Sequence, residues 1–140
     1  MNVNPKEAIG LTNLPLTLVS PLLNAYACIG KLNGKEKYGM SNYNASPVLM
    51  SIYLDAIRRH FDKILAGQIV DASDNVPHWS AILANIDIIV SAEAAGTLID
   101  DRPLVIGYEG VLDKLTPLVK SLQELHKDKT PRDFTLKDKK

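Results

Sequence analysis

The chain has 140 residues, 46% of them apolar and 23% charged, a composition typical of one ordinary globular domain. Sixteen basic and sixteen acidic residues cancel, so no overall basic charge favours nucleic-acid binding. No apolar run approaches the roughly 20 residues that span a membrane, and the N-terminus lacks the apolar segment of a signal peptide, so we expect a cytoplasmic protein without membrane or nucleic-acid partners.

The chain begins with a predicted irregular leader, residues 1–17, which holds two prolines, one glycine and three asparagines. A first helix is predicted from Pro21, because the preceding serine is a good N-cap and proline suits the first helical position. This helix should end near Gly34. It contains the one cysteine, Cys28, which excludes a disulfide within the chain and lies in an apolar run, so we expect it to be buried. A loop rich in glycine and asparagine should follow, over residues 34–44.

Two central helices are predicted next. Ser46-Pro47 again has the pattern of an N-cap and a first helical position, and apolar residues then recur at helical spacing from Met50 until Gly67 ends the pattern. After a turn-rich connection, another helix is predicted over residues 77–96. It is apolar nearly all round, which is typical of a central helix that is packed on both sides.

The last predicted elements are a fourth helix over residues 111–127, with Pro117 inside it, and a charged tail of about residues 127–140. The segment LVIGY, residues 104–108, could form a short strand, but no partner strand is predicted for it. Strand patterning is otherwise missing. The predicted fold class is therefore all-α, with three to four main helices in a single domain over residues 1–140.

The stretch YLDAIRRH, residues 53–60, allows two interpretations. On an ordinary helix surface, its aspartate would pair with the arginines three and four residues later, which stabilises a helix by roughly 0.2–0.5 kcal/mol per pair. In a site for a phosphorylated ligand, the arginines would bind phosphate through two parallel hydrogen bonds. On the next helix, His78 and Asn85 share one face and need partners if they are buried. No Walker, HExxH or G-x-S-x-G motif is present.

Five short blocks of the sequence, taken together, point to a known family. They are NPKEAIGLTNLPLTLV, KYGMSNY, IYLDAIRRH, VPHWSAILANIDII and EAAGTLIDDRP. In this order and spacing, over about residues 3–103, they resemble the phage dATP/dGTP diphosphohydrolase family, a branch of the MazG-like all-α NTP pyrophosphohydrolases. The resemblance implies a MazG-like helical bundle assembled as a homo-oligomer, in which paired protomers build the site, and the cytoplasm of a phage-infected host as its setting.

The resemblance also implies an activity and the residues that perform it. The reaction would be the hydrolysis of dATP or dGTP to the monophosphate and pyrophosphate, with Mg²⁺ or Mn²⁺ as cofactor. The implied catalytic residues are Asp55, Asp71 and His78, and the implied metal ligands are Asp55, Asp71 and Asn85. The residues implied for nucleotide binding are Lys37, Tyr38, Asn42, Arg59, His60 and His78.

The sequence departs from the family pattern at its carboxylates. Gln68 stands where the family block has a glutamate, and Arg58 stands where MazG-like helices carry an acidic residue. Glutamine is a poor substitute for a carboxylate that binds a metal or accepts a proton. Two functions therefore stay open. One is a divalent-metal-dependent diphosphohydrolase, and the other is a catalytically inactive nucleotide-binding protein that sequesters a nucleotide signal of host defence.

Overall fold

The structure is a computed structural model that describes residues 4–140, so the first three residues of the predicted leader lie outside it. The chain divides into two compact units, Met1–Asp100 and Asp101–Lys140. The single domain expected over residues 1–140 stays a prediction. The described residues are mainly helical, with two strands of two residues each, which confirms the all-α class.

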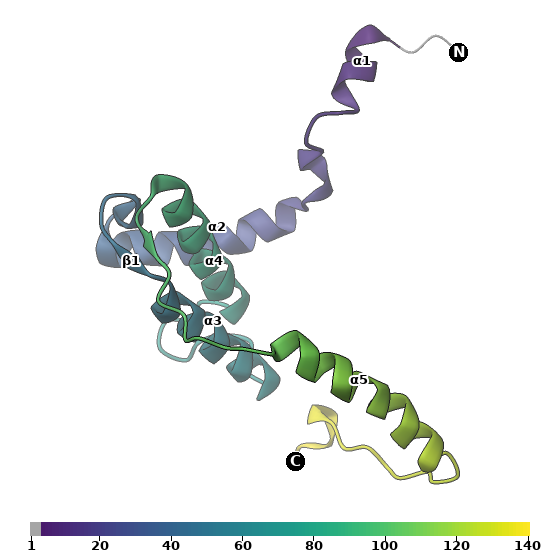
Figure 1. The fold of residues 1–140 in the computed structure, drawn as a ribbon. Coiled ribbons are helices and arrows are strands. Elements are labelled where there is room, and N and C mark those ends of the chain that lie inside the picture. The colour runs from purple at the N-terminus through teal and green to yellow at the C-terminus, as the bar shows by residue number, and fades with distance from the viewer. Residues whose placement is uncertain (1–3) are drawn as a thin grey trace. The chain divides into compact units, whose positions relative to one another are not determined.

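The first unit is built mainly from three long helices (Figure 1). They are α2 (Pro21–Tyr38), α3 (Met50–Leu65) and α4 (His78–Ala95). The shorter elements of its described residues are, in chain order, α1 (Pro5–Gly10), η1 (Leu16–Leu18), η2 (Asn42–Asn44), β1 (Val48–Leu49) and β2 (Leu98–Ile99).

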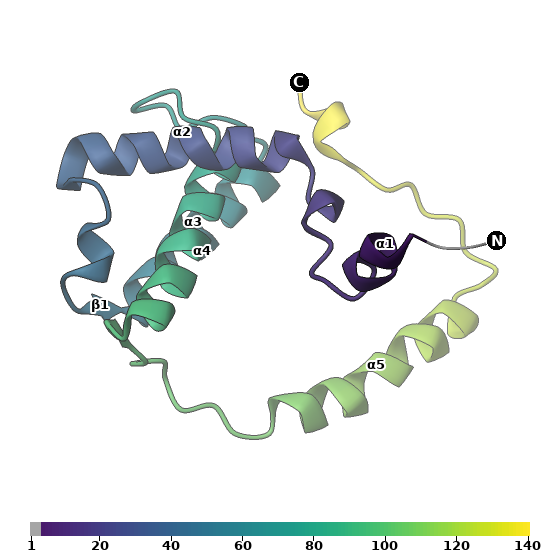
Figure 2. The same ribbon diagram turned by 90° about the horizontal axis from the view of Figure 1, so that it is seen from above.

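Helix α4 packs against both α2 and α3, which confirms its predicted central position. Seen from two sides, α3 and α4 lie side by side while α2 crosses them (Figure 1 and Figure 2). Strand β1 pairs in parallel with β2, with Val48 opposite Leu98. Because β1 leads directly into α3 and β2 follows α4, this pairing brings the start of α3 to the end of α4, so these two helices run antiparallel.

A glycine sets the distance between α2 and α4. Gly30 is buried, and a Cβ atom at this position would lie 2.1 Å from the carbonyl oxygen of Ser80 and 2.9 Å from the Cβ of Ala84. Glycine weakens a helix interior, but here it allows α4 to approach α2 this closely. Cys28, which we expected to be buried, is exposed. It lies two residues, and so about 200°, away from the face of Gly30.

Two helix boundaries differ from the prediction. Helix α2 continues past the predicted end at Gly34 and stops only before Gly39, which adopts a φ of 88°. Helix α3 begins at Met50 rather than at Pro47, because the two residues before it form β1 and pair with β2. The strand considered at residues 104–108 is absent, since these residues are irregular before they enter the next helix.

The leader is more regular than predicted. Helix α1 forms there because the Asn4 side chain accepts a hydrogen bond from the backbone N–H of Lys6, at 2.9 Å, and Pro5 takes the first helical position. Residues 4–20 are all exposed, so the described part of the leader adds no buried side chain to the first unit.

The buried core of the first unit is small. Among its described residues, the buried apolar side chains are Val48, Ala84 and Ala92, and the buried polar ones are His78 and Ser80. A folded domain normally buries many large apolar side chains. Here several of those on α2 and α4 stay about half exposed, among them Leu23, Ile29, Trp79 and Val90. The helices of this unit therefore present apolar surface that the unit itself does not cover.

The second unit consists mainly of helix α5 (Tyr108–Leu125) and the short turn η3 (Leu136–Asp138). Helix α5 begins three residues before its predicted start and keeps Pro117 inside it. The charged tail contains local structure, because the backbone N–H of Thr135 donates to the Asp138 carboxylate at 2.7 Å and caps η3. Within residues 4–140, no helix combines the length and the apolar character needed to cross a membrane.

Candidate functional site

A cavity of about 660 Å³ lies in the first unit, between the second half of α2, the segment with η2, helix α3, the connection 66–77 and helix α4. This volume is in the range of small-molecule sites. The Asn85 amide nitrogen donates to the Ala81 carbonyl at 2.7 Å, which leaves the carboxamide oxygen to offer to a ligand. The cavity brings together these residues predicted for the site: Lys37, Tyr38, Asn42, His60, Asp71 and Asn85.

One end of the cavity is cationic and aromatic. The last turn of α2 supplies Lys35, Lys37 and Tyr38, which are all exposed. Beyond Gly39 the chain turns sharply into η2, and this turn brings Asn42 to the same cavity. Ammonium groups attract phosphate, and an aromatic ring provides a flat surface on which a nucleobase can stack.

Lys31, which the sequence did not single out, joins three elements at the cavity wall. Its Nζ donates to the Tyr43 hydroxyl at 2.6 Å and forms an ion pair with Asp87 at 2.9 Å. Burial lowers the pKa of Lys31, but the hydrogen bonds with Tyr43 and Asp87 outweigh burial and raise the pKa above its usual value. Lys31 therefore stays charged and links η2 and α4 to α2.

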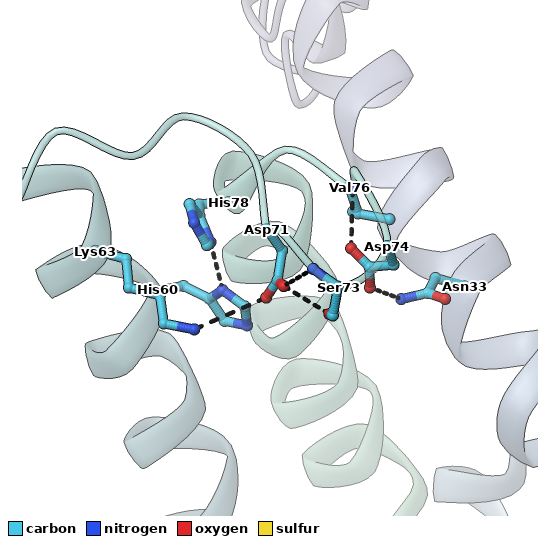
Figure 3. A network of polar contacts seen from close by, with 8 residues as sticks. All are labelled: Asn33, His60, Lys63, Asp71, Ser73, Asp74, Val76 and His78. Carbon is cyan, nitrogen blue, oxygen red and sulfur yellow. Dashed lines mark hydrogen bonds and ion pairs between the residues drawn. The ribbon is translucent and has the colours of Figure 1, made fainter.

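Three predicted residues, His60, Asp71 and His78, form a second cluster (Figure 3). They come from α3, from the connection after it and from the first residue of α4. The Nδ1 atoms of His60 and His78 are 2.8 Å apart, and the centroids of their rings are 5.1 Å apart. One ligand atom from each of the three residues lies within 4.8 Å of the other two, which is close enough for small side-chain movements to bring all three onto one metal ion.

The connection between α3 and α4 holds Asp71 in place. The backbone N–H of Asp71 donates to the carbonyl of Val76, and the backbone N–H of His78 donates to the carbonyl of Ile69, both at 2.9 Å. The Asp71 carboxylate accepts two hydrogen bonds from Ser73, at 2.9 Å from the backbone N–H and at 2.6 Å from the hydroxyl. Backbone contacts thus position this carboxylate next to the two histidines.

The electrostatics of the cluster favour a bound cation. Hydrogen bonds from the Ser73 hydroxyl and backbone lower the pKa of Asp71 to about 2, and the Lys63 ammonium, 3.9 Å away, adds to this effect. Burial lowers the pKa of His60, and the neighbouring His78 lowers it further. At neutral pH the carboxylate is therefore ionised and His60 is uncharged, which are the protonation states that bind metal ions.

His78 is fully buried, and its Nε2 atom has no hydrogen-bond partner within residues 4–140. The hydroxyl of Ser80, also fully buried, has none there either. A buried polar group without a partner costs about 1–3 kcal/mol. A buried polar group without a partner is often explained by a functional role or by a bound ion.

Two predicted residues of α3 do not line the cavity. Asp55 and Arg59 are exposed, and neither belongs to the cavity wall. Tyr53 and His60 mark the side of α3 that faces the cavity, and Asp55 lies 200° from Tyr53 around the helix. The predicted metal ligand Asp55 is thus separated from the other two predicted ligands, which do line the cavity.

The sequence reasoning missed three polar residues that shape the site, namely Lys31, Tyr43 and Ser73. Ser73 had a local signal, because an aspartate often accepts a hydrogen bond from the backbone two residues later. Lys31 and Tyr43 are 12 residues apart, and no short motif links them. Their contact follows only from the path of the chain after α2.

Comparison with known proteins gives one finding. A family model described as dATP/dGTP diphosphohydrolase, N-terminal, matches residues 3–102. These residues include every residue predicted for the site and the whole cavity wall. No curated protein and no solved structure matches the chain.

Proposed function

The chain belongs to the dATP/dGTP diphosphohydrolase family, and we propose that it hydrolyses a purine deoxynucleoside triphosphate, dATP or dGTP, to the monophosphate and pyrophosphate. The observation that carries the proposal is the cavity of about 660 Å³ in the first unit. A triphosphate needs cationic partners and a purine needs a flat apolar surface. The cavity offers both, beside an ionised carboxylate.

The nucleotide would be bound mainly by the end of α2 and by η2. Lys37 would neutralise phosphate charge, Tyr38 would stack on the purine, and Asn42 would donate a hydrogen bond. Arg59 lies outside the cavity wall and His78 is fully buried, so neither is proposed to contact phosphate in the cavity of its own chain.

Mg²⁺ or Mn²⁺ is the proposed cofactor. When bound, such an ion neutralises phosphate oxygens and lowers the pKa of the attacking water. Asp71 and Asn85 line the cavity and offer oxygen atoms, which fits Mg²⁺, an ion that commonly uses one or two carboxylates together with phosphate and water. Because the pKa of Asp71 is about 2, this residue is a weak base, and its proposed role is to hold the cation.

A homo-oligomer is the proposed assembly. The first unit leaves apolar side chains of α2 and α4 about half exposed, such as Ile29 and Val90, and a second copy could cover them. Asp55 lies away from the cavity of its own chain, so its proposed part in metal binding would be played in the cavity of a second copy.

The test of the proposed hydrolysis is a product assay. The purified chain is incubated with dATP, dGTP, ATP or GTP and with Mg²⁺ or Mn²⁺, and the products are separated by chromatography. We expect equal amounts of deoxynucleoside monophosphate and pyrophosphate, without diphosphate. Asp71→Asn should lower kcat/KM by about 100-fold. The same change at the exposed Asp62 on α3 should leave kcat/KM unchanged.

Absence of turnover by the parent chain, together with recovery of intact nucleotide from the heated protein, would contradict hydrolysis and would identify a nucleotide-binding protein that sequesters its ligand. Full turnover by the Asp71→Asn variant would leave hydrolysis in place and would contradict the proposed role of Asp71 in holding the cation.

A further inference from the structure

The cluster of His60, Asp71 and His78 contains a donor set that the expected magnesium chemistry does not explain. Two of its three members are imidazoles, whereas Mg²⁺ is a hard cation that prefers oxygen ligands. Imidazole suits first-row transition metals, and two histidines with one carboxylate form a recognised ligand set for them. The question is whether these residues form a metal site of another kind.

The contact between the two histidines has the geometry of neighbouring ligands. Their Nδ1 atoms are 2.8 Å apart, so only one proton fits between them, and at least one of the two nitrogens presents a lone pair to the other. Two nitrogens bound at about 2.1 Å to one ion, at a right angle, would lie about 3.0 Å apart. The observed spacing therefore needs to widen by only a few tenths of an ångström.

Burial of His78 is a second, independent observation. Its ring is fully buried, one nitrogen faces His60, and the other has no hydrogen-bond partner within residues 4–140. A histidine kept only for packing would satisfy both nitrogens or be replaced by an apolar residue. A metal ion on Nδ1 would leave Nε2 without a partner, so what supports a ligand role is the rigid, buried placement of the ring with Nδ1 facing His60.

The Asp71 carboxylate is also held in a fixed position. Ser73 donates two hydrogen bonds to the Oδ1 atom of Asp71, and Lys63 lies 3.9 Å from Oδ2. Partners of this kind orient the carboxylate ligands of metal sites. Lys63 has the opposite effect on a cation, because its positive charge competes for the same carboxylate.

We propose that His60, Asp71 and His78 bind one divalent transition metal ion of the first row, such as Mn²⁺, Co²⁺ or Zn²⁺, in preference to Mg²⁺. Three protein ligands leave coordination positions free. His60 and Asp71 line the cavity, so the free positions are accessible to water or to a phosphate oxygen there. The proposal shares Asp71 with the cation site of the proposed hydrolysis, but its test measures metal binding without nucleotide, so failure of the metal site and failure of hydrolysis are distinguishable.

The test measures metal binding without any nucleotide. The full chain, free of affinity tags and stripped with EDTA, is titrated with Co²⁺ and followed by visible absorption and by calorimetry. We expect one Co²⁺ per chain, which millimolar Mg²⁺ does not displace. His60→Asn and Asp71→Asn should each weaken Co²⁺ binding at least tenfold, with circular dichroism as the check on folding.

Three further variants keep the test decisive. His126→Asn, at the exposed residue just after α5, and Cys28→Ser, which removes the exposed thiol, should both leave Co²⁺ affinity unchanged. Lys63→Met should strengthen binding several-fold, because it removes a competing charge and leaves all three ligands in place. Unchanged affinity in His60→Asn and Asp71→Asn, displacement of Co²⁺ by equal Mg²⁺, or weaker binding in Lys63→Met would overturn the proposal.

Discussion

Asp71 owes its low pKa mainly to one neighbour, Ser73. The hydroxyl of this serine lies 2.6 Å from the carboxylate and makes the shorter of the two hydrogen bonds that stabilise the ionised form. We therefore predict that Ser73→Ala raises the pKa of Asp71 from about 2 towards its ordinary value of 3.8. A pH titration of the carboxyl carbon by NMR, in metal-free protein, would measure the change. An unchanged pKa would mean that the backbone N–H alone is sufficient.

The low pKa of Asp71 also makes the free energy of unfolding depend on pH. A carboxylate whose pKa is lower in the folded than in the unfolded state stabilises the fold at any pH above its unfolded-state pKa. This contribution is lost as the pH falls through the folded-state pKa. For Asp71 the window runs from about pH 4 down to about pH 2. In that window the Ser73→Ala protein should lose less stability on acidification than the parent protein does.

At this scale the sequence could place some site residues and not others. The resemblance to a family selected residues that line one cavity, such as Tyr38, His60 and Asn85. Asp55 was selected in the same way, although its helical phase, 200° from Tyr53, already set it on a different face. The pairing of His60 with His78 across 18 residues could not be predicted, since it depends on the turn that joins their helices.

Among the elements, the helices with strong local signals were predicted well. Proline and serine at the start of α2 and the glycine after α4 mark real helix ends. The start of α3 shows the limit of such rules. Ser46-Pro47 satisfies the capping pattern, yet Val48 and Leu49 form a strand, because they pair with β2 some 50 residues further along the chain. A contact that distant has no signal in the local sequence.

Helix α2 approaches α4 so closely because of Gly30, and this leads to a prediction about stability. In Gly30→Ala the new methyl group would lie 2.1 Å from the Ser80 carbonyl oxygen, so the helices must move apart. We expect the free energy of unfolding to fall by about 2–3 kcal/mol, as measured by urea unfolding and circular dichroism.

Gly34 is the matched control in the same helix. A Cβ atom there meets nothing within 4 Å, so Gly34→Ala should be neutral or should stabilise the helix by up to about 1 kcal/mol. Because alanine favours a helix more than glycine does, helix propensity cannot explain a loss of stability. Similar losses in both variants would therefore show that the close packing at Gly30 is not what destabilises Gly30→Ala.

In the molecule as a whole, many large apolar side chains are exposed to solvent. The second unit, Asp101–Lys140, is too short to build a core of its own, since chains of about 40 residues rarely fold without a partner. Its helix α5 carries apolar residues spaced alternately by three and four positions, the pattern of a helix that packs along another helix. These residues are Tyr108, Val111, Leu115, Leu118, Leu122 and Leu125.

We predict that this stripe of α5 helps to join copies of the chain. Leu115 and Leu118, near its middle, are 50% and 49% exposed, which is unfavourable for leucine in water. Multi-angle light scattering after gel filtration should show the parent chain as a dimer or larger assembly, and the measured mass should fall as the protein is diluted. The double variant Leu115→Lys, Leu118→Lys should shift the measured mass towards the 15.4 kDa of one chain.

Lys120 provides the control for that experiment, because it lies on the same helix about 200° from Leu118 and so outside the stripe. Lys120→Glu changes the charge of α5 without touching the apolar residues, and the mass should stay that of the parent assembly. If the parent chain already runs at 15.4 kDa, the stripe does not join copies, and the assembly proposed for the site loses its support. If both variants dissociate the assembly equally, charge on α5 is the determinant, and the leucine contacts are not.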